Sequence, residues 1–330
     1  MQSLRVALLC LISTATVLPA GSQTAWAQTY PSRPITIVAP YGAGGPADTL
    51  ARILAEAMKA PLGQPVVIEN VTGAAGTVGV GRVARARPDG YTLGIGNWGT
   101  HVLAASFQKL PYDVLRDFEP VALLPNNPYV IVSKNAVPAT NLKELVAWLR
   151  ANPGKATAGT GGVGNGGHVA GIYFQNVTGT AFQFVPYRSG FAGSLQDLLA
   201  GQIDLIFDQA SNALSHIQAG KLRAYAVTAK QRLTQAPEVP TVDEAGLPGF
   251  YTTSWYGLWV PTATPKDVIM KLNAAVVEAL ADPLVRKRLT DLGQEIPPRQ
   301  QQTPEALGIY HRAEIEKWAA IIKAANLKAE

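Results

Sequence analysis

The chain has 330 residues, of which 47% are hydrophobic and 15% are charged, so it can bury one large or two medium-sized cores and does not have the composition of a disordered chain. Its formal net charge of +5 is spread along the sequence without a basic stripe interleaved with aromatic residues, which argues against nucleic acid as a partner. The single cysteine excludes an internal disulfide bond and a cysteine metal cluster.

The first 27 residues have the pattern of a secretory signal peptide. Arg5 supplies a short positive region, residues 6–18 are apolar, and the AWA tripeptide at 25–27 fits the small-x-small cleavage pattern. The apolar stretch is shorter than the roughly 20 residues of a membrane span. We therefore expect residues 1–27 to be removed on export, which leaves a periplasmic protein without a thiol because Cys10 is lost.

Short apolar runs and helical periodicities alternate along the rest of the chain. The predicted strands lie at residues 35–40, 66–68, 91–95, 129–132, 182–185, 203–207, 223–227 and 255–260. One helix is predicted from Pro46 to about Gly63, because its apolar residues recur with the spacing of one buried helix face. Further helices are predicted around residues 78–83, at 142–149 behind a capping Asn141, after residue 168, between the later strands and over most of residues 265–326.

This alternation predicts an α/β fold with largely parallel sheets. Two sets of the pattern, each with a glycine-rich loop, predict two similar lobes. The helix-rich C-terminal part has no strands of its own and is expected to pack on the first lobe, so the chain must cross between the lobes twice. We place lobe 1 at residues 28–125 and 250–330 and lobe 2 at residues 126–249, with a linker at residues 125–128.

Two glycine-rich loops carry the predicted chemistry. Each lies between a strand and a helix start, at residues 41–45 and 159–168. A helix start has unpaired backbone N–H groups and the positive end of the helix dipole, and glycine lets a ligand approach the backbone closely. Such a loop binds an anion without lysine or arginine. Two of them facing each other across a cleft could hold a small dianion.

A dinucleotide-binding enzyme is the alternative interpretation of these loops. Residues 42–47 match G-x-G-x-x-A, residues 159–164 match G-x-G-x-x-G, and Glu69 ends the next strand. However, Pro46 falls inside the first match, and no acidic residue lies near 20 positions after the second. The sequence also lacks G-x-S-x-G, H-E-x-x-H and P-loop motifs, and its four histidines are scattered. We therefore expect no catalytic residue, no metal ligand and no cofactor.

Three polar side chains have both a structural and a binding interpretation. His168 stands at a predicted helix start, where it makes either a local hydrogen bond or a ligand contact. Asp48 lies in a first helical turn, where an acid complements the helix dipole or accepts a hydrogen bond from a ligand. Asp208 ends an apolar strand, at the sheet edge where binding residues collect. The residues alone leave both interpretations open.

Eight stretches of the chain resemble, in order, the receptors of the tripartite tricarboxylate transporter family, which is also called the Bug family. The matching stretches are Tyr30–Arg52, Gly63–Asn70, Pro88–Leu93, Leu110–Ala122, Val185–Gly190, Leu198–Asp208, Val239–Phe250 and Ser254–Pro265. The resemblance covers roughly residues 30–325. It implies a type II-like periplasmic-binding-protein fold, in which each of two lobes is a mixed sheet flanked by helices and the ligand cleft lies between them.

The same resemblance implies a small carboxylate ligand and membrane permease subunits as partners, and we expect a monomer. The implied ligand contacts are Tyr41, Ala43, Gly44 and Asp48 from lobe 1, Gly164, Asn165, Gly166 and His168 from lobe 2, and Thr100, Tyr187 and Asp208 along the cleft. A receptor that presents its loaded form to a signalling partner stays open as the alternative to transport.

Overall fold

A computed structural model describes residues 29–324, and the expected signal peptide at residues 1–27 lies outside them. The strands are β1 (Ile35–Ala39), β2 (Val66–Asn70), β3 (Thr92–Asn97), β4 (Phe118–Lys134), β5 (Thr157–Thr160), β6 (Gln183–Pro186), β7 (Leu205–Gln209), β8 (Leu222–Val227) and β9 (Thr253–Pro261). The α-helices are α1 (Pro46–Leu62), α2 (Thr77–Ala84), α3 (Ala104–Phe107), α4 (Leu142–Ala151), α5 (Gly166–Thr178), α6 (Phe191–Leu199), α7 (Ala210–Gln218), α8 (Lys266–Ala281), α9 (Pro283–Asp291) and α10 (Pro304–Ala324). Short helical turns lie at η1 (Ala74–Gly76), η2 (Gly99–Leu103) and η3 (Arg299–Gln301). None of the described helices combines the length and apolar composition that a bilayer crossing needs.

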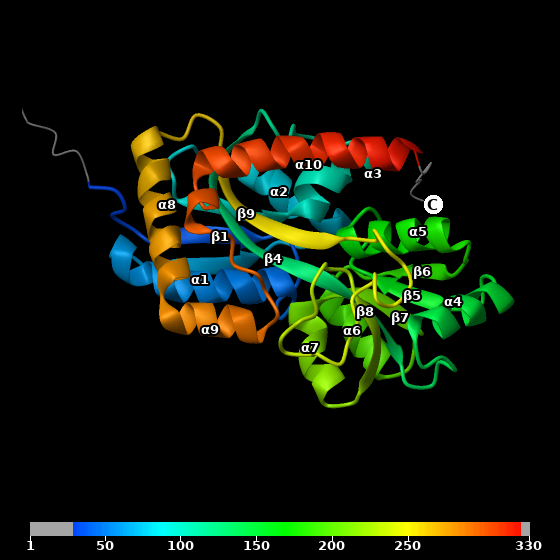
Figure 1. Cartoon of the computed structure of the whole chain (residues 1–330). Helices are drawn as coiled ribbons and strands as arrows, with labels where there is room; N and C mark the ends of the chain where they lie inside the picture. Colours follow the sequence, from blue (N-terminus) through cyan, green and yellow to red (C-terminus); the bar gives the residue numbers. More distant parts are fainter. Residues whose placement is uncertain (1–28, 325–330) are drawn as a thin grey trace, which may run out of the picture. The chain divides into compact units, whose positions relative to one another are not determined.

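The strands form one mixed sheet in the order β2-β1-β3-β9-β4-β7-β5-β6, with β8 also paired to β4 (Figure 1). β1 pairs in parallel with β2 and β3, and β5 pairs in parallel with β6 and β7. The central strand β4 runs antiparallel to β7, β8 and β9. The predicted α/β fold is confirmed, but the expectation of largely parallel sheets is wrong for the centre of the sheet. The reason is that β4 and β9 pass between the two parallel portions and pair directly with each other.

Strand β4 joins the two portions of the sheet. Its residues 118–128 pair with β9, and its residues 129–134 pair with β7 and β8. The predicted linker at residues 125–128 is therefore part of a continuous strand and not an irregular segment. Pro125 fits because the β4–β9 register shifts between Leu124 and Asn127, where its missing N–H breaks no regular ladder. Asn126 instead exchanges two backbone hydrogen bonds with Glu295.

Local sequence sets the ends of the helices beside the sheet. Helix α1 begins at Pro46, whose fixed φ suits the first helical position, and it ends at Gly63 with a left-handed φ of 65°. In front of α4, the Asn141 side chain accepts a hydrogen bond from Glu144 N at 2.9 Å. The Glu144 carboxylate in turn accepts from Thr140 N at 2.7 Å. The predicted capping of α4 is therefore present.

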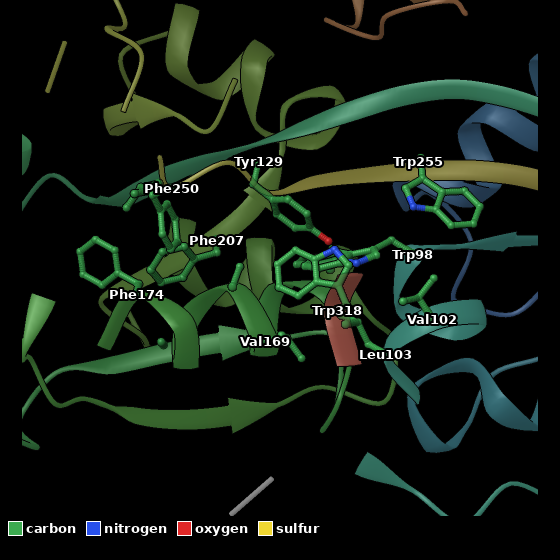
Figure 2. Packing of buried hydrophobic residues seen from close by; sticks show 14 of the residues in the cluster. Trp98, Val102, Leu103, Tyr129, Val169, Phe174, Phe207, Phe250, Trp255 and Trp318 are labelled. Carbon is green, nitrogen blue, oxygen red and sulfur yellow. The ribbon is translucent and has the colours of Figure 1, made fainter. Parts of the chain in front are cut away.

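A continuous aromatic core runs beneath both portions of the sheet (Figure 2). The ring of Trp98, which follows β3, lies 6.1 Å from that of Tyr129 on β4 and 4.5 Å from that of Trp318 on α10. The core continues to a group of phenylalanines near α5, which are Phe174, Phe207 and Phe250. Helix α10 thus contributes to the core beside β4 and also reaches α5, where the ring centres of Trp318 and Tyr173 lie 6.3 Å apart.

Candidate ligand-binding site

The first glycine-rich loop, residues 41–45, connects β1 to α1 and is here called loop 1. Gly44 has a φ of 79°, a left-handed conformation that favours glycine. Its backbone N–H donates a hydrogen bond of 2.9 Å to the Asp48 carboxylate, four residues further along the chain. Ala43 lies beside it on the exposed side of the loop. The amide expected to face a ligand at Gly44 is therefore engaged by a side chain of α1 in this structure.

The Asp48 carboxylate holds the shape of loop 1. It is buried and accepts two further hydrogen bonds, one from Arg52 Nε and one from Asn70 Nδ2, each at 2.9 Å. Burial raises the pKa of this carboxyl, but the hydrogen bonds from Arg52, Gly44 and Asn70 outweigh burial and bring the pKa below its ordinary value. Asp48 is therefore an ionised group that ties loop 1, α1 and β2 together.

The second glycine-rich loop, residues 159–168, connects β5 to α5 and is here called loop 2. Asn165 caps α5, since its side-chain oxygen accepts a hydrogen bond of 2.9 Å from His168 N. The His168 Nδ1 atom accepts a hydrogen bond of 3.0 Å from Gly164 N, so the ring proton is on Nε2. Burial lowers the pKa of His168 to about 4, so the imidazole is neutral.

Loops 1 and 2 share one construction although their sequences differ. In each, a glycine with φ near 80° donates its N–H to the side chain four residues on, from Gly44 to Asp48 and from Gly164 to His168. In each, the residue after that glycine is the N-cap of the following helix. Each loop therefore presents a helix start with the same backbone shape.

Loop 1 lies against the segment that follows β6. A Cβ atom built on Gly42 would lie 2.6 Å from the carbonyl oxygen of Ser189. Similarly, a Cβ atom built on Gly190 would lie 3.6 Å from the Cβ atom of Tyr41. Residues 41 and 42 of loop 1 are thus in close contact with residues 189–190, which connect β6 to α6.

Loop 2 lies against the segments that follow β2 and α3. A Cβ atom built on Gly162 would lie 3.2 Å from the Cα atom of Ala75, and the Gln108 side chain donates a hydrogen bond of 3.0 Å to Val163 O. Ala75 belongs to a third loop, residues 73–76, that was not among the expected contacts. The structure therefore brings three glycine-rich loops together rather than two.

A layer of buried polar side chains lies near the loops. The Tyr41 hydroxyl is hydrogen-bonded to Asn97, and burial raises the pKa of this hydroxyl. Thr100 exchanges hydrogen bonds with Asn97 at the end of β3, one from Asn97 N to Thr100 Oγ1 and one from Thr100 N to Asn97 Oδ1, each at 3.0 Å. A Cβ atom built on Gly99 would lie 3.1 Å from Gly166 N, so this strand end meets the start of α5.

Asp208 is the penultimate residue of β7 and is fully buried. Its carboxylate accepts hydrogen bonds from Gln209 N at 2.8 Å and from the Asn212 side chain at 2.6 Å. Burial raises its pKa to about 7, and these two hydrogen bonds oppose the shift without cancelling it. No lysine or arginine within residues 29–324 forms a salt bridge with it.

Ten of the eleven expected contact residues lie on loops 1 and 2, in the first turns of α1 and α5, or in the buried polar layer beside them. Tyr187 stands apart at the mouth between loop 2 and the third loop, where its hydroxyl donates to Asp197 at 2.6 Å. Direct contact of these residues with a ligand stays a prediction. The residues near the site that the sequence did not single out are Ala74, Ala75, Asn97, Tyr129 and Ser189. For Ala74 and Ala75 the sequence did offer a signal, because residues 73–76 are a further glycine-rich loop between a strand and a helix.

Comparison with known proteins identifies relatives of the whole chain. The family model for the tripartite tricarboxylate transporter family receptor matches residues 50–327. The periplasmic binding protein BugD is 38% identical, with a TM-score of 0.87, over 91% of this chain and 100% of that one. MatC from Rhodopseudomonas palustris, solved with malate, is 39% identical, with a TM-score of 0.86, over 89% of this chain and 100% of MatC. R. palustris Rpa4515, solved with adipate, is 31% identical, with a TM-score of 0.86, over 91% of this chain and 99% of Rpa4515.

These similarities agree with the mixed α/β fold. They confirm the predicted periplasmic-binding-protein fold and the resemblance read from eight sequence stretches. The chain belongs to the tripartite tricarboxylate transporter receptor family, a family of solute-binding receptors.

Proposed function

We propose that this protein is a periplasmic receptor that captures a small carboxylate between two lobes and delivers it to the membrane permease subunits of a tripartite tricarboxylate-type transporter, without catalysing a reaction. Its family relatives MatC and Rpa4515 were solved with malate and adipate, respectively. Both ligands are small dicarboxylates, which is the chemistry expected of two opposed helix starts.

The observation that carries this proposal is the shared construction of loops 1 and 2. Two helix starts with the same backbone shape follow strands from different portions of the sheet. Both lie near Gly99, where an added Cβ atom would be 3.1 Å from Gly166 N of α5 and 3.4 Å from the Tyr41 hydroxyl of loop 1. The first backbone N–H groups of a helix have no acceptor within the helix, so α1 and α5 both have donors available for an anion. A ligand bound by both starts at once favours the conformation in which they face each other.

The proposed lobes follow the two portions of the sheet. Lobe 1 comprises residues 28–125 and 250–330, and lobe 2 comprises residues 126–249. The pairing pattern supports this division, because β1 pairs with β2 and β3, and β3 pairs with β9, whereas β5 to β8 pair among themselves and with the last part of β4. Only β4 and the segment leading into β9 would connect the lobes, so they are the proposed hinge.

The contacts proposed within this site fall into two groups. Tyr41, Gly44 and Thr100 would line the lobe 1 side, where Asp48 fixes the loop. On the lobe 2 side, Gly166 would offer its N–H at the start of α5, and Asn165 and His168 would hold that start in place. Asp208 would lie in the buried layer nearby.

A ligand screen on the purified protein tests this function. Mono-, di- and tricarboxylates, amino acids, aromatic acids and a nicotinamide nucleotide are compared by thermal unfolding, followed by titration calorimetry on those that raise the melting temperature. At 100 times its dissociation constant, a specific ligand adds about 2.7 kcal/mol to the free energy of unfolding. We expect a carboxylate to do so without being consumed. A shift with the nucleotide alone, or turnover of the bound acid, would refute the receptor proposal.

A further inference from the structure

A pocket of about 480 Å³ opens at the mouth between loop 2 and the third loop. Ala75 lines it from one side, Gly162 and Val163 from loop 2, and Tyr187 and Arg188 from the segment after β6. Its lining residues therefore come from both proposed lobes. The contacts of Gly162 with Ala75 and of Gln108 with Val163, described above, hold these walls together.

Arg188 is the charged residue of this pocket. The other lining residues are neutral, and no aspartate or glutamate lines it. Arg188 is exposed and forms no salt bridge with a carboxylate in the part of the chain that the structure describes. Its guanidinium is thus available to an anion that enters the pocket, and its planar fork suits a carboxylate.

The neighbouring polar groups of the pocket are already engaged. The Tyr187 hydroxyl donates to Asp197, and the Gln108 side-chain amide donates to Val163 O. Val163 itself is 37% exposed and offers an apolar wall to a carbon chain. The pocket therefore combines one apolar wall with one cation, which is the pattern that recognises the far end of a chain carrying a second negative group.

We propose that this pocket is a distal subsite, in which Arg188 pairs with a second carboxylate of a ligand whose first carboxylate is held between loops 1 and 2. The inference rests on the proposed function and adds to it the ligand class: dicarboxylates with a chain long enough to reach from the loops to the mouth. Monoanionic acids of the same length would bind by the loops alone.

Titration calorimetry with matched ligand pairs tests the subsite. The ligands are the straight-chain dicarboxylates from succinate to adipate and their monomethyl esters, which keep the chain but lose one charge. The variants are Arg188→Ala, Arg188→Lys and, as a control, Arg87→Ala, which removes an exposed arginine outside the pocket. Thermal unfolding without ligand checks that each variant is folded.

We expect wild-type protein to bind the best dicarboxylate more tightly than its monoester. Arg188→Ala should weaken dicarboxylate binding at least about fivefold, the upper range for an exposed ion pair, and should leave the monoester unchanged. Arg188→Lys should retain part of the preference for the dicarboxylate over its monoester. Arg87→Ala should retain the whole of that preference.

Other outcomes separate the two proposals. A wild-type protein that binds the monoester as tightly as the dicarboxylate overturns the subsite, and so does an Arg188→Ala variant that loses both equally or neither. These results leave the carboxylate receptor standing. If wild-type protein binds none of these acids and none of the others in the screen, the proposed function itself is overturned, and the subsite with it.

Discussion

Gly42 offers the sharpest test of whether the two proposed lobes close on each other as the structure shows. A Cβ atom at this position would lie 2.6 Å from the carbonyl oxygen of Ser189, a distance that Cβ atoms essentially never show. The obstructing atom belongs to the backbone, so it cannot rotate away. Gly42→Ala should therefore disfavour the closed arrangement and leave each lobe able to fold.

The size of the effect follows from the overlap. Inserting one methyl group into a filled space typically costs about 1–3 kcal/mol. If this cost falls on the closed state alone, the dissociation constant of the ligand rises by about 5- to 150-fold, because binding must then overcome it. Titration calorimetry with the best acid from the ligand screen measures this change, and thermal unfolding without ligand should change little.

Gly45→Ala is a matched control in the same loop. Gly45 has an extended backbone with φ of −80°, and a Cβ atom there would lie 3.4 Å from Gly42 O, an ordinary contact. Its alanine variant should lose about 1 kcal/mol of stability, because alanine is a poorer N-cap than glycine. It should still bind within about twofold of wild type, because the added methyl group has no atom of residues 189–190 within 4 Å. Equal affinities for Gly42→Ala, Gly45→Ala and wild type would refute the closure of loop 1 onto Ser189.

Two further predictions concern stability. Burial raises the pKa of Asp208 to about 7, so the folded state binds this proton more tightly than the unfolded state does. The stability that the protonated group contributes is therefore lost as pH rises from about 4 to about 7. Asp208→Asn should reduce this pH-dependent change in the free energy of unfolding by up to about 4 kcal/mol in denaturant melts, and parallel pH curves for the two proteins would contradict the prediction. Asn165→Ala removes the side-chain acceptor for His168 N at the start of α5 and should lower the free energy of unfolding by about 1 kcal/mol. The comparison variant is Asn176→Ala, which changes an asparagine within the same helix and keeps the N-cap.

Helices and strands with a regular apolar period could be predicted from the sequence. Helix α1 shows this, because Leu50, Ile53, Leu54 and Met58 are buried as their period predicts, and a proline and a glycine lie at its two ends. Ala57, on the same predicted face, is half-buried. Strand β5 could not be predicted, since its four residues TAGT contain no apolar run. It is a strand because β6 and β7 pair with it on both sides, which is a tertiary effect.

The candidate site likewise has one part that the sequence predicts and one part that it does not. Loops 1 and 2 are local features, and glycine between a strand and a helix marks them in the sequence. The polar layer is not local: Asn97, Tyr129 and Tyr256 lie on different strands, and only the pairing of β3, β4 and β9 brings those strands together. Residues of this kind carry no signal in a single sequence, because their burial depends on partners more than 30 positions away.

The two loops achieve one geometry with side chains of different charge, and this difference bears on selectivity. In loop 1 the acceptor is the ionised Asp48, whose charge is balanced by Arg52 at 2.9 Å. In loop 2 the acceptor is His168, which is neutral because burial lowers its pKa to about 4. Each loop therefore offers backbone dipoles with no net side-chain charge, a surface that would bind one carboxylate whatever the total charge of the ligand. In the proposed site, discrimination between mono- and dianionic acids would then require a charged group outside the loops, and in the pocket between loop 2 and the third loop that group is Arg188.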